Sequence, residues 1–305
     1  MKILLLPLVL LTAWGGATMS GTALGPRLPS SPTTALAGLQ AFDFSRPAAS
    51  YSMPPELAEL SGIAVSGPDE ITGVEDETGR LYHYSLRTRG VVRVSEFASA
   101  GDYEDVARVG NDWFVMRSDG TLFRYSGTRT QRYNTGLTVA NNVEGLTYDP
   151  HTKTLLVACK GAPGGELTAT KRVIYRLHPE KYTVETPAAY VLPAMPAIGA
   201  AMAGSTSPTV ALPSKKSKKG GMGGFAPSAV AMHPRTRHVF VLSARQNGLV
   251  ELDAAGRLVA AQALPPALFP QAEGMTFTPG GDLYIATEAG NKSGTAMIHL
   301  FRPQH

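Results

Sequence analysis

Apolar and polar residues alternate over short runs along most of the chain, and these runs recur in the same order. Each unit opens with a strand-like segment, as in VEGLTYDP (143–150) and AEGMTFTP (272–279), and a second and a third apolar run follow it. Short runs rich in Val, Ile, Leu, Phe and Tyr are typical of β-strands, whereas helical repeats would need apolar residues about 3.6 positions apart. The pattern therefore predicts an all-β chain.

The opening segments repeat with a period that is typical of a β-propeller. Five of them align, with spacings of 43, 40, 84 and 45 residues between the equivalent positions, which are Ser61, Glu104, Glu144, Ser228 and Glu273. A period of about 40 to 45 residues with short strands indicates propeller blades of four strands each. We expect a single β-propeller of five four-stranded blades. The alternative is six blades, with a degenerate one in the long gap.

The two ends of the repeat region are expected to pair. The fifth unit has only three strands, and the strand-like segment 40–53 precedes the first unit. We expect this N-terminal strand to complete the last blade, because pairing the ends removes the open sheet edges. The propeller domain is thus predicted to span 40–303. Within it, residues 193–226 lack alternation and are rich in Gly, Ala, Pro and Lys, which predicts a flexible surface insert.

The N-terminus has the pattern of a secretory signal peptide. Lys2 is followed by an apolar run over 3–14 and then by small residues. The run is shorter than the roughly 20 residues that a membrane span needs, so we predict a signal peptide over 1–25, with an uncleaved anchor as the alternative. Residues 26–39, rich in Pro, Ser and Thr, are predicted to be a disordered linker. The protein is therefore expected to be exported to the periplasm or cell envelope, or secreted.

The net charge of +4 gives little sign of a basic binding surface. Five of the lysines are Lys2 and the four in the run 215–219, and without them the remaining chain has a net charge of about −1. Nucleic-acid-binding proteins spread Lys and Arg over a face that meets phosphates, so no nucleic-acid partner is predicted. The lysine run either contacts anionic polymers of the envelope or is simply solvated.

Five segments in order carry a resemblance to a known family: ELSGIA, GDYEDVARVGNDWFVMRSDGTLFRY, NVEGLTYDP with LLVACKG, FAPSAVAMHP and FPQAEGMTFTPGGDLYIATEAG. Over roughly 38–302 the chain resembles the SdiA-regulated family of bacterial β-propeller proteins. The resemblance implies an exported or envelope-associated propeller. The family includes a calcium-regulated propeller proposed to be phytase-like, which implies a calcium-dependent phosphoric ester hydrolase as one function. No catalytic residue is assigned.

Acidic residues are expected to gather at one mouth of the propeller channel. The loops that lead into the first strand of each blade lie on the same face as the loops that join the second and third strands. Carboxylates brought together there repel each other unless their pKa values rise, basic residues pair with them or a cation binds. Ca²⁺ accepts an irregular set of oxygen ligands, and the absence of His and Cys from these positions argues against zinc. The predicted Ca²⁺ ligands are Glu75, Glu104, Glu144, Glu273 and Glu288.

Two classes of function follow from this arrangement. In the first, Arg117 and Lys160 bind a small anionic or phosphorylated ligand, and the protein is a calcium-dependent, phytase-like phosphoesterase. In the second, it is a non-catalytic binding or scaffolding propeller of the periplasm or envelope, and the acids pair with Arg117 and Lys160 to fasten neighbouring blades. No HExxH, GxSxG, P-loop or CxxC motif favours another chemistry. We expect a monomer.

Overall fold

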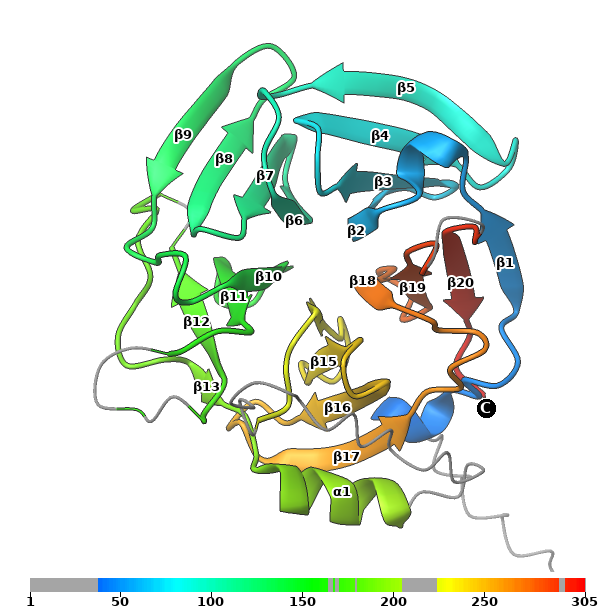
Figure 1. Cartoon of the computed structure of the whole chain (residues 1–305), viewed down its shortest axis with the longest axis vertical. Coiled ribbons are helices and arrows are strands. Elements are labelled where there is room, and N and C mark those ends of the chain that lie inside the picture. Colours follow the sequence, from blue (N-terminus) through cyan, green and yellow to red (C-terminus); the bar gives the residue numbers. More distant parts are fainter. Residues whose placement is uncertain are drawn as a thin grey trace, which may run out of the picture. The chain divides into compact units, whose positions relative to one another are not determined.

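The computed structural model describes residues 38–304, except 164–166, 168–169, 179, 205–223 and 291–293. Over these residues the chain forms five four-stranded antiparallel sheets, arranged as blades around a central axis (Figure 1). The innermost strand of each blade contacts the innermost strands of both neighbouring blades, so the ring is closed. The prediction of a five-bladed β-propeller is confirmed for the described residues. The predicted signal peptide, 1–25, and the lysine run, 215–219, lie outside them.

The first three blades follow the order of the chain, from the innermost strand outward (Figure 1). Blade 1 consists of β2 (Leu60–Gly67), β3 (Glu70–Glu75), β4 (Arg80–Ser85) and β5 (Gly90–Glu96). Blade 2 consists of β6 (Tyr103–Val109), β7 (Asp112–Arg117), β8 (Thr121–Tyr125) and β9 (Thr130–Asn134). Blade 3 consists of β10 (Val143–Asp149), β11 (Thr154–Cys159), β12 (Val173–Leu177) and β13 (Tyr190–Val191).

The N-terminal strand completes the last blade. Blade 4 consists of β14 (Ala229–Met232), β15 (Val239–Ser243), β16 (Gly248–Leu252) and β17 (Leu258–Ala263). Blade 5 consists of β18 (Ala272–Phe277), β19 (Leu283–Thr287), β20 (Met297–Phe301) and, outermost, β1 (Ala49–Ser52). β1 pairs with β20 in antiparallel register, from Ala49 opposite Leu300 to Ser52 opposite Met297. The predicted closure of the ring by an N-terminal strand is confirmed.

The hydrophobic core lies between the blades. Among the described residues there are five hydrophobic clusters, and each joins two neighbouring blades; Phe240 of blade 4 and Met275 of blade 5, for example, share one cluster. Both faces of a blade are therefore covered, and middle strands such as β11 are buried at every residue. This explains why the second run of each unit is almost continuously apolar, and why Cys159 is a buried free thiol.

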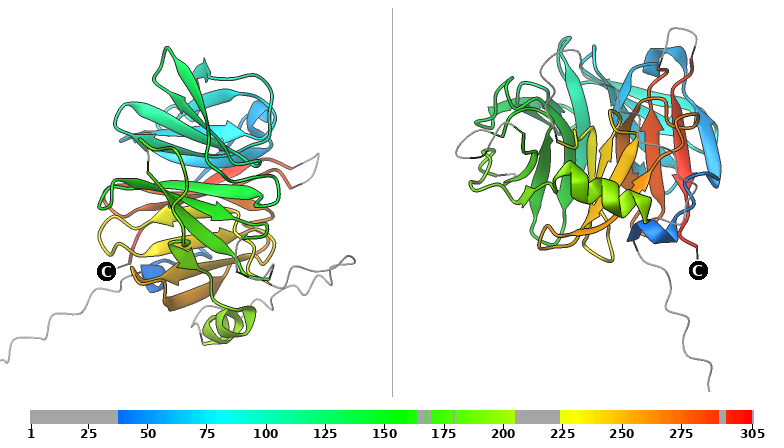
Figure 2. Two further views of the ribbon diagram at one scale, coloured as in Figure 1. Left: turned by 90° about the vertical axis from the view of Figure 1, so that its left-hand side faces the viewer. Right: turned by 60° about the horizontal axis from the view of Figure 1, so that its bottom comes forward.

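Two boundaries differ from the sequence-based expectation. The predicted flexible insert begins as a helix, α1 (Met195–Ala203), and the residues after it, 205–223, lie outside the described part. Pro196 stands in the first turn of α1, where its missing N–H costs nothing, and Ile198 and Met202 are one turn apart and buried beside β17 (Figure 2). The insert thus contains a one-sided helix that its Gly- and Ala-rich composition masks.

The predicted linker also ends earlier than residue 39. Gly38 and Leu39 are buried in a short 3₁₀ helix, η1 (Gly38–Ala41), and the Leu39 N–H donates to Glu251 Oε2 at 2.8 Å. A second 3₁₀ helix, η2 (Pro55–Leu57), links β1 to blade 1. Within the described residues no helix is both long enough and apolar enough to cross a membrane.

Candidate functional site

A β-bulge stands at the same place in four of the five innermost strands. The strand register shifts between the two neighbours of each bulged residue, and these residues are Ser61, Glu104, Glu144 and Glu273. At a bulge two residues of one strand face a single residue of the partner, which turns a side chain out of the regular alternation. The glutamates that mark the repeat in the sequence are therefore the bulged residues.

The glycine that follows the bulge lets neighbouring innermost strands approach closely. A Cβ atom on Gly62 would lie 2.4 Å from the Cα of Asp105, and one on Gly145 would lie 2.9 Å from the N of Val230. No side chain fits in that space. In three of the four bulged strands, a side chain turned out by the bulge is thus followed by a glycine that leaves room for the neighbouring strand, whereas in blade 2 the residue after the bulge is Asp105.

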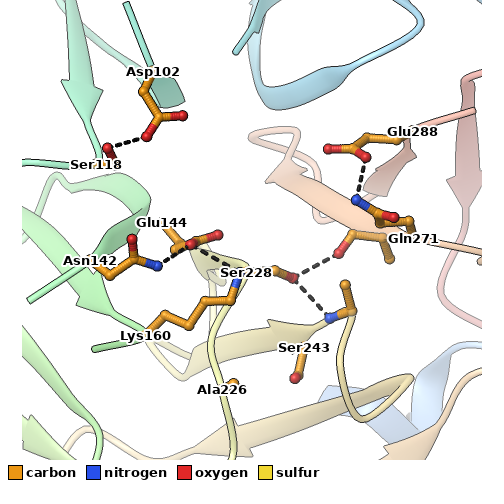
Figure 3. Close-up of polar contacts among 12 residues, drawn as sticks. Asp102, Ser118, Asn142, Glu144, Lys160, Ala226, Ser228, Ser243, Gln271 and Glu288 are labelled. Atoms are coloured by element: carbon orange, nitrogen blue, oxygen red, sulfur yellow. Dashed lines mark hydrogen bonds and ion pairs between the residues drawn. The ribbon is translucent and has the colours of Figure 1, made fainter. Parts of the chain in front are cut away.

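The bulged side chains meet in one cavity, which we call the acidic cavity. It has a volume of about 160 Å³ and is lined by residues of all five blades: Ser61, Asp76, Asp102, Glu104, Glu144, Lys160, Ser228, Gln271, Glu273 and Glu288. Four of the five predicted metal ligands are in this set. Figure 3 shows side chains from separate blades facing the same space. With six carboxyl groups and one amine, the lining is strongly acidic.

Some of these carboxyl groups have polar partners and others have none. Glu144 Oε1 accepts from Lys160 Nζ at 2.9 Å and from Asn142 Nδ2 at 2.5 Å, and Glu288 accepts from the side-chain amide of Gln271 (Figure 3). By contrast, Glu104 makes no hydrogen bond or ion pair with another residue of the described part. Asp76 is in a similar position, because its buried Oδ1 has no hydrogen-bond partner in the described part. Glu104 and Asp76 thus have unused hydrogen-bonding capacity in the acidic cavity.

Burial and crowding raise the pKa values of the carboxyl groups. Burial, followed by the charge of neighbouring carboxylates, raises the pKa of Glu104 to about 9, of Glu288 to about 8, of Glu273 to about 7 and of Asp76 to about 6. Burial also raises the pKa of Glu144, although Lys160 opposes the shift. The cavity therefore holds protons near neutral pH, because burial and the neighbouring negative charges both disfavour the ionised carboxylates.

Lys160 supplies the single positive charge of the cavity lining. Burial lowers its pKa, but the carboxylates of Glu144, Glu273 and Glu104 outweigh that effect, so the pKa is raised overall and the amine stays charged. The ion pair with Glu144 at 2.9 Å engages this charge. Lys160 thus balances one carboxylate and leaves the others without a cationic partner.

Two predicted site residues lie outside the cavity lining. Glu75 accepts the backbone N–H groups of Glu77 and Thr78, both at 2.9 Å, so it closes the turn after β3. Arg117 pairs with Asp119 in its own hairpin, and its guanidinium lies 5.9 Å from the centre of the Phe123 ring. Both side chains serve local structure in this conformation.

Two other lining residues, Asp102 and Gln271, were missed by the sequence analysis. Asp102 and Gln271 stand two residues before the bulged glutamates of their blades, and Asn142, which bonds Glu144, occupies the same position in blade 3. A polar residue two positions before the bulge was the signal that could have found them. Ser228, which replaces the glutamate in blade 4, donates to Ala272 O at 2.7 Å and fastens blade 4 to blade 5.

The donors suit a cation, but they do not form a finished metal site. Carboxylate oxygens are the ligands that Ca²⁺ prefers, and it needs about six to eight oxygens at roughly 2.3–2.6 Å. Among the described residues, no group of three or more His, Cys, Asp or Glu side chains could hold a metal ion as they stand. A metal in the acidic cavity would require several carboxylates to turn inward together.

Comparison with known proteins agrees with the fold and with the motifs. Residues 226–291 match the SdiA-regulated family model. This match covers the start of blade 4 through the end of β19, including the bulge of blade 5, and it confirms the resemblance seen in the sequence over that region. No curated protein sequence matches the chain.

Several solved structures resemble this chain to different degrees. Glutaminyl cyclase from Myxococcus xanthus is 16% identical, with 85% of this chain and 96% of that chain covered and a TM-score of 0.54. Virginiamycin B lyase from Staphylococcus aureus is 11% identical, with 83% and 73% covered and a TM-score of 0.42. A luciferin-regenerating enzyme is 9% identical, with 84% and 95% covered and a TM-score of 0.46. At such identities the similarity shows the fold alone.

Proposed function

We propose that the protein is a binding propeller whose acidic cavity takes up a cation, with Ca²⁺ as the ion that the sequence favours. The observation that carries this proposal is the charge of the lining, six carboxyl groups against Lys160. A bound cation would relieve the repulsion that otherwise keeps those groups protonated. Glu104, Glu144 and Glu273 are the residues that would hold it, because they are turned into the cavity by their bulges.

A phytase-like phosphoesterase activity is the other function that the sequence suggests. The cavity lining supports it less well, since Lys160 is paired with Glu144 and Arg117 with Asp119. A phosphate would meet carboxylates unless a cation were bound first. Bound Ca²⁺ would supply the positive charge needed to receive a phosphoryl group. Hydrolysis would therefore depend on prior binding of the cation.

Thermal melts with and without divalent ions test the cation proposal. A ligand that binds only the folded state stabilises it by about 2.7 kcal/mol at a hundredfold excess over Kd. For a domain of this size that corresponds to a rise in Tm of roughly 5–10 °C. We expect Ca²⁺ to raise Tm, and a chelator to reverse the rise. Mg²⁺ should raise Tm less than Ca²⁺, because it requires a more regular, octahedral set of ligands.

Matched variants assign the effect to the cavity. Glu104→Gln and Glu273→Gln should remove most of the Ca²⁺-dependent rise in Tm, whereas Glu96→Gln on the outermost strand of blade 1 should keep it. If Ca²⁺ leaves the Tm of the wild-type protein unchanged, the cation proposal is wrong for this ion. Release of phosphate from inositol phosphates, measured with Ca²⁺ and with chelator, tests the hydrolytic half separately.

We also propose that the protein is exported, that it acts in the periplasm or at the cell envelope, and that it is monomeric. The leader-like segment 1–25 supports the export proposal. Cell fractionation with N-terminal sequencing of the recovered protein tests export and cleavage together. Light scattering of the purified protein tests its monomeric state.

A further inference from the structure

The opposite end of the ring carries a second cavity, which we call the apolar pocket. It has a volume of about 330 Å³ and is lined by the later residues of all five innermost strands, including the nearly fully buried side chains of Ile63, Leu146 and Met275. It shares no lining residue with the acidic cavity. Small-molecule sites are typically concave, about 300–1,000 Å³ in volume and mostly apolar, with a few polar groups. The apolar pocket fits that description, and the smaller acidic cavity does not.

Arg108 is the single charged residue in the lining of the apolar pocket, as far as the described residues show. Its Nε donates to Gly110 O at 3.1 Å, and its Nη1 donates to the carbonyl oxygen of Ser66 in blade 1. Its guanidinium lies 5.5 Å from the centre of the Trp113 ring. These contacts hold the guanidinium in place, but carbonyl oxygens do not neutralise its charge.

Three carboxylates near this end of the ring have other partners, and one of them, Glu70, accepts the hydroxyl of Ser66 at 2.8 Å. Asp112 pairs with Arg124, and Asp149 accepts the N–H of His151 at 2.9 Å in its own turn. No described carboxylate forms an ion pair with Arg108. The pocket therefore combines an apolar floor with an exposed guanidinium that carbonyl oxygens hold in place and that has no ion-pair partner among the described residues.

We propose that the apolar pocket binds a small organic anion, an apolar body bearing one carboxylate. The apolar body packs against the partly exposed side chains of Val65, Tyr148 and Phe277, and the carboxylate accepts hydrogen bonds from the remaining N–H groups of Arg108. A guanidinium is well suited to this, because its N–H donors are fixed in a fork that matches a carboxylate. The pocket is independent of the cation proposal, since it lies at the other end of the channel.

Titration with octanoate and with its neutral counterpart octanol tests the proposal. Trp113 lies under the Arg108 guanidinium, and in a Trp14→Phe background of the full chain it is the one tryptophan left, so its fluorescence reports on the pocket. We expect octanoate to bind with one-to-one stoichiometry by calorimetry and to change this fluorescence. Octanol should bind at least about tenfold more weakly, because it lacks the charge-assisted hydrogen bonds.

Two variants and a control separate charge from packing. Arg108→Gln should weaken octanoate binding about tenfold or more and leave octanol binding nearly unchanged. Thr276→Phe, which fills the pocket without touching the charge, should weaken both ligands, and Arg87→Gln, outside the lining, should weaken neither. Melting curves check that each variant is folded. Absence of octanoate binding, equal binding of octanol, or an unchanged affinity in folded Arg108→Gln or Thr276→Phe would overturn the proposal.

Discussion

The close approach of the innermost strands leads to a sharp prediction for Gly62→Ala. The new Cβ would lie 2.4 Å from the Cα and 2.5 Å from Oδ1 of Asp105, so backbone as well as side chain must move. Overpacking of a tight interior costs about 1–3 kcal/mol, and the contact with backbone puts this site at the upper end. Replacing Gly by Ala returns about 0.4–1 kcal/mol by restricting the unfolded chain. The net loss of stability is therefore about 2 kcal/mol.

Thermal denaturation of matched glycine variants measures this loss. A destabilisation of about 2 kcal/mol lowers Tm by roughly 4–8 °C in a domain of this size. Gly90→Ala is the control, because a Cβ there meets nothing within 4 Å; its Tm should rise by about 1–4 °C. If both variants melt at the same temperature, the innermost strands can move apart freely, and the argument that no side chain fits at Gly62 is wrong.

Three further predictions concern buried ionisable groups. Without added cations, Tm should fall as pH rises from about 5 to 9. Burial and then neighbouring carboxylates raise the pKa of Glu104 to about 9, so in this pH range the folded protein keeps a proton that the unfolded chain releases. Tm of Glu104→Gln should depend less on pH, and an unchanged slope would contradict this prediction. His233 should make the protein less stable as pH falls. Burial lowers the pKa of His233 to about 4, and its Nδ1 accepts the N–H of Thr236, so the free energy of unfolding should drop by about 3 kcal/mol between pH 6.5 and 4. Urea denaturation measures this drop, which should be smaller in His233→Asn. Asp105→Ala removes the acceptor for the buried N–H of Leu146 and should lower the free energy of unfolding by about 1–3 kcal/mol; a variant as stable as the wild type in urea would show that this N–H finds another partner.

The repeat in the sequence was sufficient to predict the architecture. Alternating runs at a near-constant spacing indicate blades, and the missing strand of the last unit indicates ring closure by β1, because a propeller cannot leave a blade open without exposing an edge. The gathering of Glu104, Glu144 and Glu273 followed from the same repeat, since equivalent positions in a ring face the same axis.

The parts that could not be predicted depend on local geometry. Glu75 is the last residue of β3 and accepts the N–H groups of its own turn, whereas Glu288 follows β19 and lines the cavity. The strand register makes Asp76 the blade-1 equivalent of Glu288, and Asp76 also lines the cavity. The sequence has three consecutive acidic residues at 75–77 and does not show which of them faces the channel. Similarly, Arg117 pairs with Asp119 of its own hairpin and lies outside the cavity lining. The bulges could not be predicted from the sequence either, because a register shift depends on both paired strands.

The pairing of β1 with β20 has a consequence for the order of assembly. Ala49–Ser52 is synthesised early, but its partner strand ends at Phe301, so the ring cannot close until almost the whole repeat region has been made. Until then two sheet edges stay unpaired and open to proteases and to other chains. A product truncated before β20 therefore keeps an unpaired sheet edge, which quality-control proteases can recognise.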